Sequence, residues 1–176
     1  VGIGDDCAVI PWKDNLFLLA TTDMLIEDVH FLRTKIHPED LGYKSLAVNL
    51  SDIAAMGGTP SNAYISIGIP KNIEVEWLDK FYDGLYELAS SENVYLLGGD
   101  TTKSPSHLII NITVLGYVET DKVKFRSTAK EGDIICATDF LGDSGGGLKI
   151  LLENYDINEI TYDEIAYELI KRHHRP

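Results

Sequence analysis

The chain has 176 residues, of which 44% are hydrophobic and 24% charged, so it can form one sizeable core or one core and part of a second. Its 28 acidic residues exceed its 15 basic ones, and the resulting net charge of −13 opposes binding to nucleic acid or to an anionic membrane surface. No apolar run reaches the roughly 18 residues of a membrane-spanning helix, and the start does not resemble a signal peptide.

The cysteine content indicates the redox environment, and the two ends of the sequence indicate whether it is a fragment. Cys7 and Cys136 are far apart and form no C-x-x-C pair, so the sequence predicts neither a disulfide scaffold nor a zinc ribbon. This usage favours a reducing cytoplasm. The chain begins without Met in a glycine-acidic turn and stops directly after a helix-like pattern, so we expect a fragment of a longer protein.

The hydrophobic pattern predicts interleaved strands and helices. In chain order we expect strands near residues 7–10 and over 16–21, a helix over about 40–56, a strand over 63–69, a helix over 75–90, strands over 94–97, 107–118 and 133–137, and helices over 146–153 and 162–171. This order predicts an α+β or α/β sandwich rather than a helical bundle. A soft boundary is expected between residues 118 and 132, followed by a truncated second unit.

Acidic residues recur where predicted apolar strands begin or end. Asp5 and Asp6 precede one strand, and Asp23 and Asp100 follow two others. Up to Thr102 the chain has 16 acidic and 6 basic residues, against 12 and 9 afterwards, which places the excess carboxylates in the first part. A single such Asp is usually a turn or cap residue, but four of them favour a ligand site at the strand ends.

The helix predicted over 40–56 carries a thin polar stripe beside a broad apolar sector. Ser45, Asn49 and Asp52 fall within this stripe on a helical projection. One interpretation is that Asp52 is buried and takes a cation from solution, because an unpaired buried charge costs several kcal/mol. The other is that Asn49 and Asp52 face solvent or cap a turn, and the helix alone does not decide between them.

Gathered carboxylates without a thiol or a histidine pair suit a hard divalent cation. Mg²⁺ takes one or two carboxylates and leaves positions for water and phosphate oxygens, which points to phosphate chemistry. The sequence has no EF-hand loop, no H-E-x-x-H, no G-x-x-x-x-G-K-[ST] loop and no G-x-G-x-x-G turn. Calcium sensing and zinc proteolysis are therefore disfavoured, and any nucleotide is held without a P-loop.

Three further features, the glycine-rich run, His30 and Arg126, each have two interpretations, whereas Cys7 has one. The glycine-rich run 142–147 can open a helix that offers N–H groups to an anion, although a flexible interdomain turn is favoured. His30 and Arg126 can each meet a substrate, but a single residue of either type is more often a surface or structural residue. Cys7 is predicted to be a core residue, because burial and the neighbouring Asp6 disfavour its thiolate.

Several motifs, in their order along the chain, resemble one known family, thiamine-monophosphate kinase. They are Gly2–Ala8 (GIGDDCA), Thr21–Leu25 (TTDML), Val29–Phe31 (VHF), Lys44–Gly57 (KSLAVNLSDIAAMG), Gly98–Thr102 (GGDTT), Arg126-Ser127, Gly132-Asp133, Gly142–Ser144 (GDS) and the ending His173–Pro176 (HHRP). Each motif is weak alone, whereas the ordered set spans nearly the whole chain and is specific.

The resemblance implies a fold, an activity and a set of site residues. It places the chain in the aminoimidazole-ribonucleotide-synthetase-like superfamily, with residues 1–125 as an amino-terminal ATP/Mg-binding and dimerisation domain and 126–176 as the truncated start of a second α/β domain. The mixed sheets of two copies would pair across a homodimer into a β-barrel with ATP near it. The implied reaction transfers the γ-phosphoryl group of ATP to thiamine monophosphate, giving thiamine diphosphate.

The motifs also imply residue roles. Several Mg²⁺ ions would be bound by Asp6, Thr21, Thr22, Asp23, Asp52 and Asp100. ATP would contact Gly99, Asp100 and Arg126, and His30 would lie against the thiamine substrate. No catalytic acid or base is implied, and the role of Asp5 stays open. These roles agree with the residue-level hypothesis of a carboxylate-bound cation that screens repulsion between two phosphates.

The chain departs from the family in lacking most of the carboxy-terminal domain, including a further acidic metal motif and residues that enclose the thiamine ring. We therefore expect this segment alone to bind nucleotide and Mg²⁺ with little turnover. Two alternatives stay open. One is a related enzyme that acts on formylglycinamidine ribonucleotide or selenide, and the other is a non-catalytic nucleotide-binding or dimerisation module.

Overall fold

The computed structural model describes residues 3–138, 140–153 and 164–176. Its centre is one five-stranded mixed sheet in the order β1-β2-β5-β3-β4. The strands are β1 (Ala8–Pro11), β2 (Leu16–Ile26), β3 (Thr59–Ile69), β4 (Tyr95–Lys103) and β5 (Ile109–Glu119). Only β3 and β4 pair in parallel, and the other neighbours are antiparallel.

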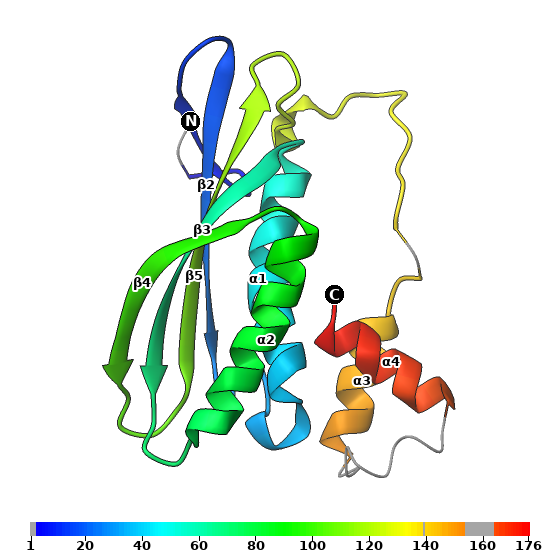
Figure 1. The fold of residues 1–176 in the computed structure, drawn as a ribbon. Coiled ribbons are helices and arrows are strands. Elements are labelled where there is room, and N and C mark those ends of the chain that lie inside the picture. The colour runs from blue at the N-terminus through cyan, green and yellow to red at the C-terminus, as the bar shows by residue number, and fades with distance from the viewer. Residues whose placement is uncertain (1–2, 139, 154–163) are drawn as a thin grey trace.

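Two long helices, α1 (Pro38–Ala55) and α2 (Val75–Ser91), cover one face of the sheet (Figure 1). Alternate residues of β5, from Ile110 to Val118, are buried beneath them, as expected for a sheet with one covered face. Gly42 of α1 and Gly84 of α2 allow this layer to pack closely, because a Cβ on Gly42 would lie 1.9 Å from the Phe81 carbonyl oxygen. The predicted α+β class with a mixed sheet is confirmed.

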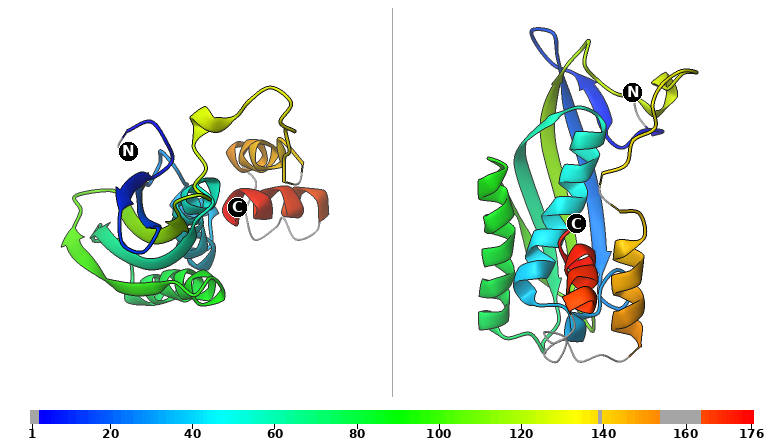
Figure 2. Two further views of the ribbon diagram at one scale, coloured as in Figure 1. Left: turned by 90° about the horizontal axis from the view of Figure 1, so that it is seen from above. Right: turned by 90° about the vertical axis from the view of Figure 1, so that its right-hand side faces the viewer.

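The last part of the chain forms a helix pair beside α1, on the side away from the sheet (Figures 1 and 2). After the short 3₁₀ helix Arg126–Thr128, an extended connection leads to α3 (Asp143–Leu152) and α4 (Glu164–His174). Lys44 of α1 donates to the His173 carbonyl at 3.0 Å. Arg175 contacts Asp40 of α1 at 2.5 Å and Glu87 of α2 at 2.7 Å, so charged contacts join this pair to the first two helices.

In this part of the chain two sequence predictions are wrong, and a third falls partly outside the described residues. The predicted strand over 133–137 is wrong: Ile134 and Ile135 are 87% and 99% exposed, and no described strand pairs with this segment. The favoured turn at 142–147 is also wrong, because α3 begins at Asp143 directly after Gly142, and the helix predicted over 146–153 starts three residues earlier. The start of the helix predicted over 162–171 lies outside the described residues, which resume at 164.

The second face of the sheet has no helix over it in the described ranges 3–138, 140–153 and 164–176. Met24 and Tyr64 lie on this open face and are 51% and 40% exposed. Two strand edges are also unpaired among these residues. β4 is the outermost strand on one side, and on the other side β1 pairs only with Phe17–Ala20, so that the second half of β2 has no neighbour beyond it.

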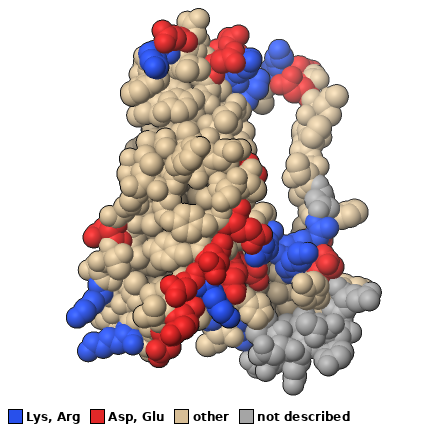
Figure 3. Space-filling view, viewed as in Figure 1, with Lys and Arg blue, Asp and Glu red and all other residues tan. Residues whose placement is uncertain are grey.

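The acidic excess of the first part is divided between two places. A band of acidic side chains follows the exposed face of α2, where Glu76, Asp79, Asp83 and Glu87 lie (Figure 3). This band is a solvated helix face. It accounts for part of the charge asymmetry that the sequence assigned to a ligand site. In addition, no described helix is long and apolar enough to cross a membrane.

Candidate functional site

The polar stripe of α1 packs against β2 and forms the centre of the candidate site. Thr21 Oγ1 donates to Asp52 Oδ2 at 2.5 Å, and the backbone N–H of Asp23 donates to Asn49 Oδ1 at 3.0 Å. Asn49 is completely buried, and its Nδ2 donates to the Ser45 carbonyl at 3.2 Å. The interpretation that Asn49 faces solvent is therefore wrong: Ser45 and Asn49 are buried, whereas Asp52 at the end of the stripe is partly exposed.

Negative charge is concentrated around this contact. Burial raises the pKa of Asp23, and the nearby Asp52 carboxylate raises it further, while His30 acts in the opposite direction. Cys7 is 2% exposed, and burial together with Asp52 and then Asp6 raises the pKa of its thiol to about 12. Cys7 is thus an inert core residue as predicted, and the Asp52 and Asp6 carboxylates both act on its thiol.

Arg126 closes one side of the site through ion pairing. Its guanidinium pairs with the Asp6 carboxylate, with Nε 3.4 Å from Oδ2, and its backbone N–H donates to Asp5 Oδ1 at 2.7 Å. The hydrogen bond from Arg126 holds the pKa of Asp6 below its usual range. Two residues that the sequence assigned to different ligands, Asp6 to metal and Arg126 to ATP, therefore contact each other here.

His30 lies in the loop that follows β2. Its Nδ1 accepts a hydrogen bond from the Ile26 N–H at 3.0 Å, which leaves the proton of the neutral ring on Nε2. The ring is exposed and lines a cavity of about 240 Å³ between this loop and the α3–α4 pair, together with Phe31, Leu148 and His173. Its charge lowers the pKa of Asp23, against the effects of burial and of Asp52.

Gly99 and Asp100 lie in β4, away from the β2–α1 contact. A Cβ on Gly99 would lie 1.6 Å from the Ile65 carbonyl oxygen, and its φ of +151° also favours glycine. Beside them is an open hollow of about 410 Å³, lined also by Tyr82 and Tyr86 of α2. These tyrosines were not among the predicted site residues. Tyr82 and Tyr86 are four residues apart, and each directly follows a buried residue of α2, Phe81 or Leu85. This spacing could have indicated an aromatic face beside the buried one.

The predicted metal residues do not converge within one chain. Across the sheet, Asp23 of β2 pairs with Ile112 of β5, Ile112 pairs with Ile65 of β3, and Ile65 pairs with Gly99 of β4. Three strand spacings, about 14 Å, therefore separate the strands that carry Asp23 and Asp100. The two carboxylates also belong to different faces. Asp100 lies opposite Ser66, and the same line of paired residues across the sheet reaches the exposed Met24, so Asp100 belongs to the open face. Asp23 lies in line with Ile112 and Ile65, which are buried beneath the helices.

Thr22 also lies on the open face, where its hydroxyl bonds with the Ile112 carbonyl at 3.2 Å and with Asn111 and Thr113 at 3.0 Å. Moreover, Asp23 and Asp100 lie inside β2 and β4 rather than at strand ends. The prediction of strand-end positions is wrong for both residues, because each strand runs three residues beyond its Asp.

The donor set suits a hard cation. Asp23, Asp52 and the Thr21 hydroxyl supply oxygen ligands, and Mg²⁺ needs only one or two carboxylates when phosphate oxygens and water complete its shell. The raised pKa of Asp23 next to Asp52 indicates a pair of negative groups that a cation would stabilise. The described residues contain no group of three or more His, Cys, Asp or Glu side chains placed to hold a metal.

Comparison with known proteins identifies the class. Residues 4–118 match the model of the family "AIR synthase related protein, N-terminal domain". This match includes the whole sheet as far as Val118, both covering helices, and the contact between Thr21 and Asp52. The chain therefore belongs to the AIR synthase related family.

Within this class, the similar curated proteins are named thiamine-monophosphate kinase. The relative from Bacillus subtilis is 39% identical over 176 residues, which are 100% of this chain and 54% of the relative, and the one from Haemophilus influenzae is 42% identical over 100% of this chain and 51% of the relative. A solved structure described as AaThiL complexed with AMPPCP and TMP has a TM-score of 0.90 and 37% identity, covering 99% of this chain and 53% of that one. The chain thus spans about half the length of these relatives.

The replacement of Asn49 by Ala tests the β2–α1 contact. Because Asn49 is buried and bonds both Asp23 and Ser45, we expect N49A to lower the free energy of unfolding by about 1–3 kcal/mol. Denaturant unfolding measures this change. S51A, on the exposed side of the same helix, should change it by less than about 0.5 kcal/mol. Equal stability of N49A and wild type would show that the contact contributes nothing.

Proposed function

We propose that this chain is the ATP-binding and dimerisation part of a thiamine-monophosphate kinase, which forms thiamine diphosphate from ATP and thiamine monophosphate. The similarity to the structure described with AMPPCP and TMP, over 99% of this chain, is the observation that carries the proposal. The contact of Thr21, Asp23, Asn49 and Asp52 supports it, because a carboxylate-rich site suits a reaction between two phosphates.

In this proposal Asp6, Thr21, Thr22, Asp23, Asp52 and Asp100 provide the oxygen ligands for Mg²⁺ ions. When bound, these ions would neutralise the phosphate charge that otherwise keeps donor and acceptor apart. The protein's part is to hold its ligands in place: the Asn49 amide fixes the backbone of Asp23, and the Thr21 hydroxyl fixes one oxygen of Asp52. Such preorganisation favours charge stabilisation in the transition state.

ATP is proposed to contact Gly99, Asp100 and Arg126. The hollow beside Gly99 adds Tyr82 and Tyr86, whose ring centroids are 6.4 Å apart, and an aromatic wall of this kind suits a purine. The absent side chain of Gly99 lets the β4 backbone lie close to Ile65 at the floor of this hollow. Arg126, now paired with Asp6, would exchange that carboxylate for phosphate oxygens.

Thiamine monophosphate is proposed to lie against His30 beside the α3–α4 pair. His30 presents its Nε2–H toward a ligand, because Nδ1 is held by the Ile26 backbone. No general base is needed, since the acceptor phosphate oxygen is already ionised at neutral pH. Positioning and charge stabilisation are then the main contributions of the protein.

The unpaired strand edges support a homodimer whose sites are shared. If the open faces of two sheets close into a barrel, β4 of one copy lies next to the uncovered half of β2 in the other. This arrangement would place Asp100 of each copy beside Thr22 and Asp23 of its partner. It removes the lateral separation of three strands that exists within one chain, although Asp23 and Asp100 still belong to opposite faces of their strands.

The remaining parts of the proposal concern organisation and context. The first domain would end near residue 125, and α3 and α4 would begin the second domain, which supplies the rest of the thiamine pocket. We propose cytoplasmic activity, with ATP and thiamine monophosphate as partners. A related superfamily enzyme and a non-catalytic module are the alternatives that the next experiment separates.

Replacement of Asp52 by Asn in the whole protein tests the activity. Because Asp52 holds negative charge where the cation would bind, we expect D52N to form thiamine diphosphate at least about 100-fold more slowly than wild type. D79N, on the exposed face of α2, should match wild type. Thiamine diphosphate is measured after incubation with Mg·ATP and thiamine monophosphate. A wild-type protein that forms none contradicts the proposed reaction.

Mixed dimers test the shared site. D23N and D100N should each be inactive, but after random exchange of subunits their mixture should recover about a quarter of wild-type activity, because half of the dimers then hold one intact site. A double variant, D23N with D100N, mixed with wild type should instead give inactive mixed dimers. If the single variants show no recovery although exchange is complete, each site is formed within one chain.

A further inference from the structure

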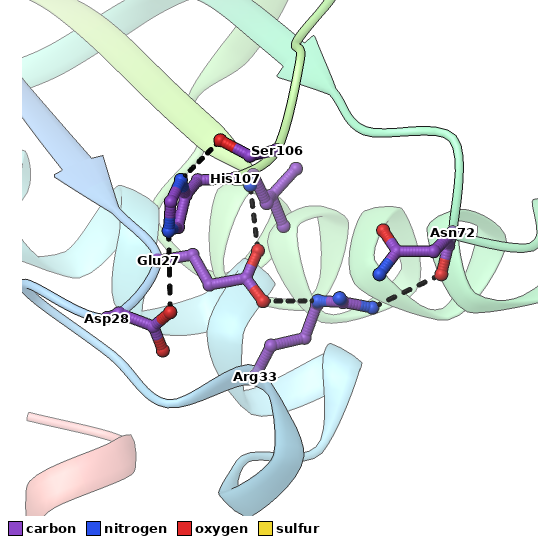
Figure 4. Close-up of polar contacts among 7 residues, drawn as sticks. Glu27, Asp28, Arg33, Asn72, Ser106 and His107 are labelled. Carbon is purple, nitrogen blue, oxygen red and sulfur yellow. Dashed lines mark hydrogen bonds and ion pairs between the residues drawn. The ribbon is translucent and has the colours of Figure 1, made fainter.

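Figure 4 shows a partly buried ion pair at the end of the sheet from which the His30 loop leaves β2. Glu27 directly follows β2 and is 8% exposed. Its Oε1 accepts a hydrogen bond from Arg33 Nε at 2.7 Å, and its Oε2 accepts one from the Leu108 N–H at 2.8 Å. The backbone N–H of Glu27 donates to the Leu108 carbonyl at 3.0 Å, so one residue is joined three times to its surroundings.

Arg33 extends this link to a third segment. Its Nη1 donates to the Asn72 carbonyl at 3.3 Å, in the connection between β3 and α2. Thus Glu27 and Arg33, six residues apart, close the loop that contains His30 and tie it to two other parts of the chain. In the same cluster Asp28 Oδ2 lies 3.5 Å from His107 Nε2, and Ser106 Oγ lies 2.7 Å from His107 Nδ1 (Figure 4).

The loop between these two residues has a defined backbone. Asp28 adopts a positive φ of 64°, and its N–H donates to the Phe31 carbonyl at 2.9 Å. The N–H of His30 donates to the Ile26 carbonyl at 2.9 Å, while the His30 ring accepts the Ile26 N–H. Phe31 is 6% exposed and fixes the loop to the core. The direction of the His30 ring therefore depends on the backbone that Glu27 and Arg33 close.

A partly buried ion pair adds little to stability, because desolvation offsets most of the attraction, but it constrains geometry. We infer that Glu27 and Arg33 are positioning residues that fix the His30 ring, through the loop 27–33, for the acceptor substrate. This inference rests on the proposed function for the identity of that substrate, whereas the orientation of the ring can be measured without it. Neither residue touches the candidate carboxylates, so their effect should be confined to the acceptor side.

The experiment compares E27Q and R33K in the whole protein with E119Q, which changes an exposed pair with Lys122 at the far end of β5. E27Q removes the charge, and R33K keeps it but offers one nitrogen in place of the two that reach Glu27 and Asn72. We expect KM for thiamine monophosphate to rise about tenfold in E27Q and less in R33K, since small misplacements of binding groups are costly. KM for ATP should stay within about twofold, and E119Q should match wild type.

A second readout needs no turnover. Nitrogen-15 NMR of the imidazole should show wild-type His30 with Nδ1 unprotonated and Nε2 protonated, and E27Q with a mixture of the two tautomers. If E27Q does not fold, R33K must show the same displacement to a smaller extent. Unchanged His30 signals and an unchanged KM, with only a lower unfolding temperature, would overturn the inference. If wild type forms no thiamine diphosphate, the proposed function fails, but the NMR result still decides whether Glu27 and Arg33 hold the ring.

Discussion

The crowding of negative charge where β2 meets α1 is the constraint on which the rest of the structure depends. Burial and then the Asp52 carboxylate raise the pKa of Asp23, and burial, Asp52 and Asp6 raise that of the Cys7 thiol. Like charges in a partly buried position destabilise a fold unless hydrogen bonds or cations offset them. Thr21, Asn49 and Arg126 provide part of that offset, and in the proposed function Mg²⁺ ions with a triphosphate would provide the remainder.

The helices around α1 hold it in contact with β2. Close packing at Gly42 and Gly84 holds α1 against α2, so that the stripe of Ser45 and Asn49 is pressed onto β2. Arg175 and Lys44 join the α3–α4 pair to the same helix and place a cavity next to His30. The open face of the sheet, by contrast, has no cover in the described part of the chain, and it carries Thr22 and Asp100 toward the proposed partner.

Local sequence patterns correctly predicted the helices, whose hydrogen bonds and exposed faces depend on residues close in sequence. The three- to four-residue period gave α1 and α2 to within a few residues, and the polar stripe on α1 identified Asn49 and Asp52 before any contact was known. Sequence patterns gave the wrong secondary structure where contacts with other segments determine it. Residues 133–137 have strand-like composition but no described neighbour to pair with, and the glycine run 142–147 forms the first turns of α3 because Leu169 packs against Gly146 and Gly147.

Long-range arrangement was the other limit. Nothing in the sequence around Asp23 and Asp100 places them on different faces and three strands apart, because strand order depends on pairings between residues that are distant in sequence. The ion pair of Asp6 with Arg126 and that of Glu27 with Arg33 likewise join segments by packing. The family resemblance named the residues, whereas only the fold shows which of them one chain can bring together.

Calorimetric titration of the whole protein with a non-hydrolysable ATP analogue, before and after removal of divalent cations, tests the central claim most directly. If the carboxylates hold the triphosphate through cations, binding should disappear in the metal-free protein and return when Mg²⁺ is added. Equal affinity with and without divalent cations would contradict the account.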